Sequence, residues 1–193
     1  SVLDTNIVSG LGGKNCRATN GRVEVCNRKY GNNGWLGLAQ IWVSGSHITK
    51  GVAKMNDTYF STSTYNTTGW RSLVMCQEIG HTFGLGHQDE NFSNPPIVPH
   101  TCMDYFVPAS SENVGPNQHD YDMLETIYAH LDSTTTVGAQ EPSRTNGNTG
   151  SVDLENPSEW GKSQGKDGNG KDHLFVRDFG NGKKVFTFVF WVK

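Results

Sequence analysis

The chain has 193 residues and a formal net charge of −3, which leaves room for one well-packed core and an appendage. A chain with so small a charge has no basic field that would attract nucleic acid. The most apolar run, residues 185–192, has the length of a strand and is too short to cross a bilayer. We therefore expect a soluble, monomeric protein that binds neither nucleic acid nor membranes.

Four cysteines and an abundance of Gly, Asn, Ser and Thr are typical of secreted proteins, in which disulfides persist. Cys16 and Cys26 flank the turn signal Asn-Gly-Arg at residues 20–22, so one disulfide is predicted to close a local hairpin. Cys76 and Cys102 would then form the other. The alternative is four reduced thiols, although the sequence contains no C-x-x-C pair of the kind found in zinc knuckles and redox sites. The cysteines therefore favour an extracellular location.

The first third of the chain predicts strands. Residues 22–26 alternate between polar and apolar side chains. Residues 36–43 and 47–55, separated by Ser-Gly-Ser, are rich in β-branched and aromatic side chains. They predict an antiparallel hairpin.

Two helices are predicted in the middle of the chain. Thr68 can cap the first, which begins near Trp70 and should end at Gly84, because glycine accepts the left-handed conformation that closes helices. The second helix is expected over residues 117–131, where apolar residues recur at helical spacing. The inner side of the first helix is predicted to carry Leu73, Cys76, Ile79, His81 and Phe83.

The composition changes after the second helix. Residues 133–172 are rich in Ser, Thr, Gly, Asn and Lys and lack hydrophobic periodicity, which predicts a loop or linker. Residues 173–193 contain two apolar runs around Asn181-Gly182, a strong signal for a tight hairpin turn. We expect this hairpin to dock onto a main domain formed by residues 1–132, because an isolated hairpin is marginally stable.

The segment 76–87, Cys-Gln-Glu-Ile-Gly-His-Thr-Phe-Gly-Leu-Gly-His, carries the chemistry of the predicted first helix. Residues four apart project from one helical face, so Gln77 and His81 can reach a common point while Glu78 stands beside it. In the zinc-protease helix H-E-x-x-H, both histidines at this spacing bind zinc and the glutamate acts as general base. His87 adds a third potential ligand beyond the glycine turn.

With Gly84 at the turn, this segment resembles the H-E-x-x-H-x-x-G-x-x-H motif of metzincin zinc metalloproteases, with Gln77 in place of the first histidine. Downstream, Met103 and Tyr105 in Thr-Cys-Met-Asp-Tyr stand where astacin-like and serralysin-like metzincins have their Met-turn methionine and a tyrosine. The chain also resembles secreted bacterial matrixin-like proteases. The resemblance covers mainly residues 36–131.

The resemblance implies an α+β metzincin fold with a twisted mixed sheet, an active-site helix, a Met-turn and a C-terminal helix, extended here by the C-terminal hairpin. It implies a secreted, zinc-dependent endopeptidase acting on a protein or peptide substrate. Zinc would bind Gln77, His81 and His87. Glu78 would be the general base, and Tyr105 would hydrogen-bond the developing oxyanion. The predicted strand pair upstream would hold the peptide.

Gln77 is the main departure from the metzincin pattern, because an amide oxygen is a poorer zinc donor than an imidazole nitrogen. Three arrangements remain open: Gln77 Oε1 completes the ligand set, Tyr105 or a water takes its place, or the site binds metal too weakly to work. We favour the first, because the other catalytic residues are present. The alternative function is a metzincin-like pseudoenzyme that binds peptides or proteins without cleaving them.

Other polar and aromatic residues have simpler interpretations. Asp89 and Glu90, just after His87, are interpreted as solvated acids or calcium ligands, so Ca²⁺ is a second candidate ion. Asp89 is also a candidate for a substitute metal ligand. A surface-binding role for the hairpin would require Trp160 and Trp191 to be exposed. The remaining histidines, of which His100 is the candidate spare ligand, are interpreted as structural or surface residues: His47, His100, His119, His130 and His173.

Overall fold

A computed structural model of the chain describes residues 2–9, 16–90, 101–104, 113–130 and 156–193. It shows an α+β fold with one six-stranded mixed sheet, which confirms the predicted α+β class and mixed sheet. The elements are, in chain order, β1 (Val23–Arg28), β2 (Trp35–Ser44), β3 (His47–Asn56), α1 (Asp57–Phe60), α2 (Thr68–Thr82), α3 (Gln118–Ile127), the 3₁₀ helix η1 (Pro157–Glu159), β4 (Lys162–Lys166), β5 (Asp172–Gly180) and β6 (Lys183–Trp191).

The strand order is β1-β3-β2-β6-β5-β4, with β1 parallel to β3 and every other pair antiparallel. The two predicted hairpins are present as β2–β3 and β5–β6. Asn181 and Gly182 turn the second hairpin with φ angles of 53° and 73°, as its tight turn requires. Because β6 pairs with β2 from Trp35 to Ser44, the C-terminal hairpin belongs to the same sheet as the strands of the first third.

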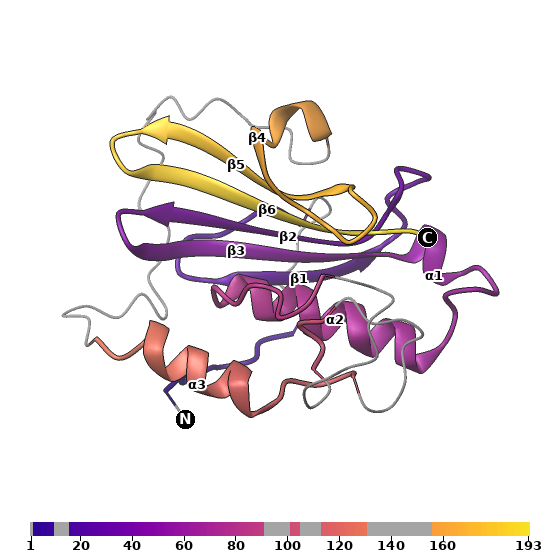
Figure 1. The fold of residues 1–193 in the computed structure, drawn as a ribbon, viewed down its shortest axis with the longest axis horizontal. Helices are drawn as coiled ribbons and strands as arrows, with labels where there is room; N and C mark the ends of the chain where they lie inside the picture. The colour runs from indigo at the N-terminus through magenta and orange to yellow at the C-terminus, as the bar shows by residue number, and fades with distance from the viewer. Residues whose placement is uncertain (1, 10–15, 91–100, 105–112, 131–155) are drawn as a thin grey trace.

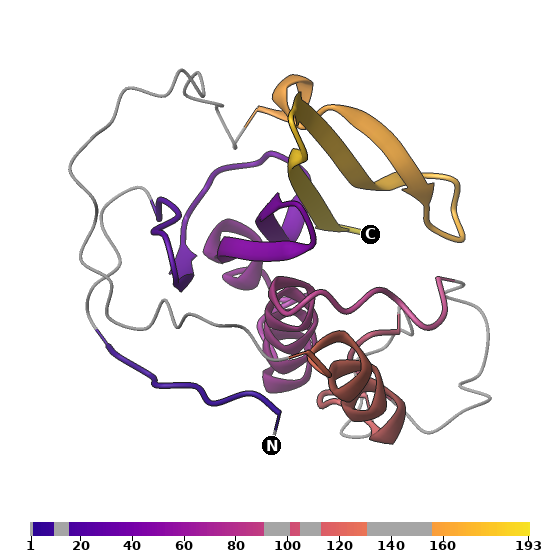
Figure 2. The ribbon, with the colours of Figure 1, turned by 90° about the vertical axis from the view of Figure 1, so that its left-hand side faces the viewer.

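Helices α2 and α3 lie on the same side of the sheet, with α2 next to the strands (Figures 1 and 2). Along β6, Phe188 and Phe190 face α2, and Phe190 joins the core that the helix buries. Val189 between them points to the opposite face, where it packs with Trp35 and Trp160. The period-2 alternation of this strand therefore serves two cores, one on each face of the sheet.

The structure differs from the prediction of a loop over residues 133–172. The described part of this range contains η1 and β4, and β4 forms the edge of the sheet beside β5. Its sequence Lys-Ser-Gln-Gly-Lys has no hydrophobic signal because four of its five residues are exposed. Trp160 is only 1% exposed and Trp191 is partly buried, so the exposure that a surface-binding role of the hairpin would require is not found.

Helix α2 begins and ends on local signals. Thr67, one residue before the predicted cap, accepts a hydrogen bond from the amide of Trp70. At the other end, the amides of Gly84 and Leu85 donate to the carbonyls of His81 and Gly80. This is the Schellman arrangement, and Gly84 adopts the positive φ of 92° that it requires. The predicted stop at Gly84 is therefore confirmed.

Helix α3 begins with a capping box in which Asn117 and Asp120 satisfy each other's backbone amides. It ends at Ile127, before the predicted limit at residue 131, which lies outside the described residues. The buried Asp120 carboxylate also accepts hydrogen bonds from Thr101 and Gln88. One carboxylate thus ties the helix to the two segments on either side of residues 91–100.

Both predicted disulfides are present, Cys16–Cys26 and Cys76–Cys102. The first joins β1 to the segment that precedes it. The second joins α2 to the segment that carries Met103. The expectation that Cys16–Cys26 closes a local hairpin is wrong, because in the described part of the chain no strand precedes β1, which pairs in parallel with β3. No helix in the described part of the chain is long and apolar enough to span a membrane.

Gly37 of β2 is the point at which α2 comes closest to the sheet. A Cβ at residue 37 would lie 2.4 Å from Oε1 of Glu78 and 2.5 Å from Cγ1 of Val74, both buried. We predict that Gly37→Ala lowers the free energy of unfolding by about 1–3 kcal/mol through overpacking, measured by urea denaturation. Gly115→Ala is the matched control, because a Cβ there would meet nothing within 4 Å; equal losses in both variants would contradict the close packing.

Candidate metal site

Helix α2 presents polar side chains to the sheet. Gln77, Glu78 and His81 are each 1% exposed, so three polar side chains of the helix are buried. The predicted inner side was therefore partly wrong: Leu73 and His81 are buried against the sheet, but Cys76, Ile79 and Phe83 line the opposite side of the helix. Buried polar side chains need partners or a function, so this face of α2 is where a site is expected.

The ring of His81 is held in one orientation and one tautomer. It stacks on Phe188 of β6, with ring centroids 4.1 Å apart and planes 10° apart. Its Nδ1 lies 2.8 Å from the carbonyl oxygen of Leu85. A carbonyl can only accept, so Nδ1 carries the proton and Nε2 carries the lone pair.

The lone pair of His81 faces His87. The two Nε2 atoms are 2.9 Å apart, and the rings meet edge to face with centroids 4.6 Å apart. Two nitrogens bound to one tetrahedral zinc at its usual bond length would be roughly 3.3 Å apart. The helix end at Gly84 makes this approach possible, because it reverses the chain between the two histidines. The two histidines predicted as ligands therefore lie side by side, and their role in metal binding stays a prediction.

The amide of Gln77 is oriented by the backbone around Met103. Its Nε2 donates to the carbonyl of Cys102 at 2.9 Å and to that of Asp104 at 3.4 Å. Its Oε1 is buried and has no hydrogen-bond partner among the described residues. A buried amide oxygen without a partner costs free energy, and a bound cation would satisfy it.

The carboxyl group of Glu78 lies against Gly37 of β2. Both of its oxygens are buried and have no hydrogen-bond partner in the described part of the chain. Burial raises the pKa of Glu78 well above its ordinary value, because a desolvated carboxylate is disfavoured. In this environment Glu78 can hold a proton at a pH where an exposed glutamate has lost it.

Met103 lies beneath the helix, fully buried. A Cβ at Gly80 would come within 2.5 Å of its sulfur, so the glycine allows the methionine to touch the helix backbone. The carbonyl of Met103 accepts a hydrogen bond from the amide of Gln88 at 2.8 Å, which fixes the segment just after His87. Met103, predicted as the Met-turn residue, thus touches α2 and is hydrogen-bonded to the segment after His87. Tyr105 lies outside the described residues.

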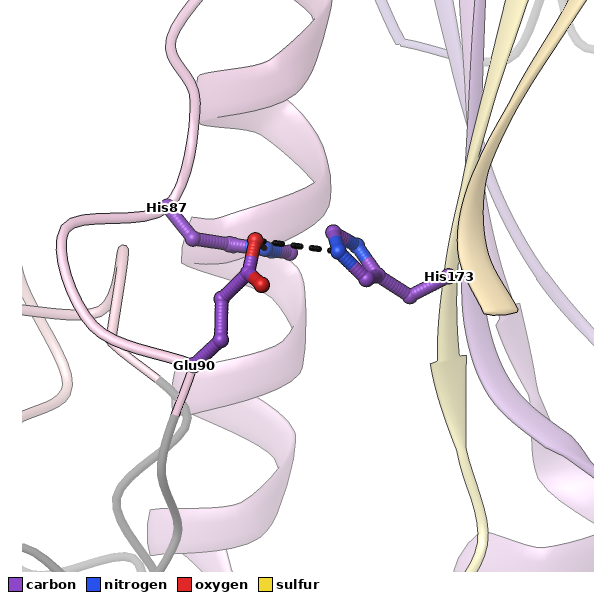
Figure 3. A group of neighbouring side chains, drawn as sticks. All are labelled: His87, Glu90 and His173. Atoms are coloured by element: carbon purple, nitrogen blue, oxygen red, sulfur yellow. Dashed lines mark ion pairs between the residues drawn. The ribbon is translucent and has the colours of Figure 1, made fainter. Parts of the chain in front are cut away.

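Two residues that the sequence analysis did not assign to the zinc site lie beside His87; Glu90 was interpreted as a solvated acid or calcium ligand, and His173 as a structural or surface residue. His173 projects from β5, Glu90 follows His87 on the segment after α2, and the three side chains point toward one another (Figure 3). Oε1 of Glu90 is 2.9 Å from Nε2 of His173 and 3.6 Å from Nδ1 of His87. Nothing in the local sequence around His173 indicates this, because the contact depends on β6 and β5 joining the sheet.

The surroundings of all three histidines disfavour the charged imidazolium. Burial is the main cause that lowers the pKa of His81, of His87 and of His173. Proximity to one another lowers the pKa of His81 and His87 further, whereas Glu90 acts against the lowering at His173. Neutral imidazole is the form that binds metal ions, so the cluster is ready to ligate near neutral pH.

The strand pair β2–β3 does not offer a free edge to a peptide. Strand β2 is paired with β3 and β6, and β3 is paired with β1 and β2. The edges of the described sheet are β1 and β4, so the expectation that β2–β3 holds the peptide is wrong for strand addition. A cavity of about 670 Å³ lies on the other side of α2, where it is lined by apolar residues including Met75, Ile79, Phe83 and Leu124.

Comparisons with protein-family models, with curated proteins and with solved structures find no match to this chain. The likeness to metzincins therefore rests on the motif residues.

Burial of Glu78 predicts a pH dependence of stability in the metal-free protein. Above the ordinary pKa of a glutamate, about 4.3, the unfolded chain releases this proton and the folded chain keeps it, so stability falls as the pH rises. Glu78→Gln removes the titrating group. We expect the difference in free energy of unfolding between Glu78→Gln and the parent to grow in favour of the variant above pH 4, by up to about 1.4 kcal/mol per pH unit. Urea denaturation in the presence of a chelator measures it.

The exposed Glu125 provides the matched control. Glu125→Gln should follow the pH profile of the parent chain. A constant difference between Glu78→Gln and the parent from pH 4 to pH 8 would show that the carboxyl of Glu78 is solvated.

Proposed function

We propose that the protein is a secreted, zinc-dependent endopeptidase of the metzincin type. The observation that carries this proposal is the pair of Nε2 atoms of His81 and His87, 2.9 Å apart on the face of α2 that also carries Glu78. Two disulfides are compatible with an extracellular location. The protein would act on proteins or peptides.

His81, His87 and Gln77 would hold the zinc ion. Oε1 of Gln77 has no hydrogen-bond partner among the residues that the structure describes, which supports this assignment. The amide nitrogen is already bonded to two backbone carbonyls, so the oxygen is the atom left to bind an ion. The carbonyl of Leu85 supports His81 in the same way that carbonyls and carboxylates orient histidine ligands in metal sites. Oε1 of Gln77 and Nε2 of His81 are thus each oriented by a hydrogen bond that the other end of the same side chain makes.

Zinc, when bound, would lower the pKa of water and polarise the scissile carbonyl. Glu78 would take a proton from the attacking water and pass it to the leaving amine. Its buried position suits a group that must hold a proton between these two steps, because burial raises its pKa. Tyr105 would hydrogen-bond the oxyanion, as the metzincin resemblance implies.

The competing proposal is a pseudoenzyme of the same type that binds a peptide or protein without cleaving it. Two observations favour it: Glu78 is almost fully buried, and the strand pair β2–β3 has no free edge for a substrate. The two proposals differ in one measurable property, which is cleavage that depends on both zinc and Glu78.

We predict that the zinc-loaded protein cleaves casein, that a chelator abolishes the cleavage, and that Glu78→Gln lowers kcat at least about a hundredfold. Zinc content by atomic emission should stay the same in Glu78→Gln, because the glutamate is not a proposed ligand. Glu125→Gln is the exposed matched control and should keep full activity. Stoichiometric zinc without any cleavage would favour the pseudoenzyme.

Replacing Gln77 by histidine tests the ligand set itself. If Oε1 of Gln77 binds zinc, Gln77→His should raise zinc affinity at least about tenfold, because imidazole is the better donor. Competition with a chromophoric chelator measures the change. Unchanged affinity would mean that residue 77 does not contact the ion.

A further inference from the structure

We propose that His87, Glu90 and His173 form a second zinc site, which fastens the C-terminal hairpin to the segment that follows α2. The three residues offer two imidazole nitrogens and one carboxylate oxygen, and these atoms all lie within 4.8 Å of one another. His87 and His173 are separated by 86 positions in the sequence, so the site exists only in the folded chain. This proposal does not rest on peptidase activity and requires neither Gln77 nor Glu78.

The two distances from Glu90 to the histidines are close to those between ligands of one ion. Oε1 of Glu90 is 2.9 Å from Nε2 of His173 and 3.6 Å from Nδ1 of His87, values that bracket the roughly 3.3 Å expected between two ligands of a tetrahedral zinc. Two histidines and one glutamate are a ligand set that zinc accepts. Calcium and magnesium prefer oxygen ligands, so the two nitrogens favour a transition metal.

The backbone around the three side chains is fixed before any ion binds. The amide of Gly168 in the β4–β5 turn donates to the carbonyl of Glu90 at 2.7 Å. That turn is itself closed by Asp167, whose carboxylate accepts from the amides of Asn169 and Lys171. The hairpin and the segment after α2 are therefore already held beside each other. Binding of an ion would need to order few additional residues.

The structure makes room for His173 and surrounds it with negative charge. A Cβ at Gly165 of β4 would lie 2.8 Å from Nε2 of His173, so the absence of a side chain at residue 165 leaves that nitrogen accessible to a ligand partner. The side chains of His173 and His87 are 3% and 2% exposed, whereas that of Glu90 is 39% exposed. The carboxylates of Glu90, Asp167 and Asp172 all act electrostatically on His173, as expected around a bound cation.

His87 is shared with the first site, and its two nitrogens face different partners. Nε2 faces His81, and Nδ1 is on the side of Glu90. A neutral imidazole has one lone pair, so His87 serves one ion at a time. When Nδ1 of His87 binds an ion, Nε2 of His87 carries the proton and can donate a hydrogen bond to Nε2 of His81. The carbonyl of Leu85 orients the His81 ring for this contact. We therefore expect one zinc per chain, with the two sites as alternatives.

His81→Phe separates the two sites. It keeps an aromatic ring against Phe188 and removes both nitrogens, so the first site is lost and the second keeps all three ligands. We expect His81→Phe to bind one zinc per chain with an affinity within about a hundredfold of the parent, since only an outer hydrogen bond is lost. His173→Ala added to this variant should lower the affinity at least a further hundredfold.

His119, exposed on α3, gives the matched control. The double variant His81→Phe with His119→Ala should bind zinc as His81→Phe does. If His81→Phe binds no zinc while the parent chain does, or if His173→Ala leaves the affinity of His81→Phe unchanged, the second site is refuted. The peptidase proposal would survive either result, and loss of casein cleavage in Glu78→Gln bears on that proposal alone.

Hydrogen exchange tests the second site in His81→Phe, from which the first site has been removed. Zinc should slow amide exchange in β5 and in the β4–β5 turn of this variant, and adding Glu90→Gln should abolish this protection. Zinc titrated into metal-free protein is the only ligand required. Protection confined to α2 and the turn that follows it would overturn the inference.

Discussion

The fold depends on a polar helix face that is packed against a sheet. Gln77, Glu78 and His81 occupy positions at which α2 meets β2 and β6, and their burial is permitted by the missing side chain at Gly37 and by the flat ring of Phe188. Burying such groups costs free energy unless each one gains a partner. The partners are backbone carbonyls for Gln77 and His81, a second imidazole for His81, and none among the described residues for the carboxyl of Glu78. A cation is the group that would satisfy the atoms that remain.

The surroundings of this face are arranged to keep it in place. The Cys76–Cys102 disulfide, the contact of Met103 with Gly80 and the hydrogen bond from Gln88 to Met103 tie the helix to the segments on either side of residues 91–100. Asp120 links the same segments to α3 through hydrogen bonds from Thr101 and Gln88. Because these contacts act on backbone positions adjacent to the candidate ligands, they limit how far His81, His87 and Gln77 can move apart. Such support is what a preorganised site requires.

Local signals in the sequence predicted most of the fold. The Asn-Gly turn, the glycine after α2 and the alternation in β6 act over a few residues, and the structure follows each of them. The predicted inner side of α2 was partly wrong because hydrophobic periodicity assumes that apolar residues face the core, whereas Gln77 and Glu78 do so here. Strand β4 was missed because its side chains are mostly exposed. The proximity of His173 to His87 could not be predicted, since it depends on strand order and register across the whole sheet.

The pairing of β6 with β2 has a consequence for how the chain acquires its structure. Trp35 pairs with Trp191, so the last strand in the sequence occupies an inner position and completes a core begun by one of the first. Loops that span this much sequence close slowly, because their entropy is lost before the pairing energy is gained. During synthesis, β2 therefore lacks a pairing partner on the side away from β3 until residue 191 has left the ribosome. Over that interval the nascent chain is exposed to mispairing, and removing the final twenty residues would leave a permanent gap in the middle of the sheet.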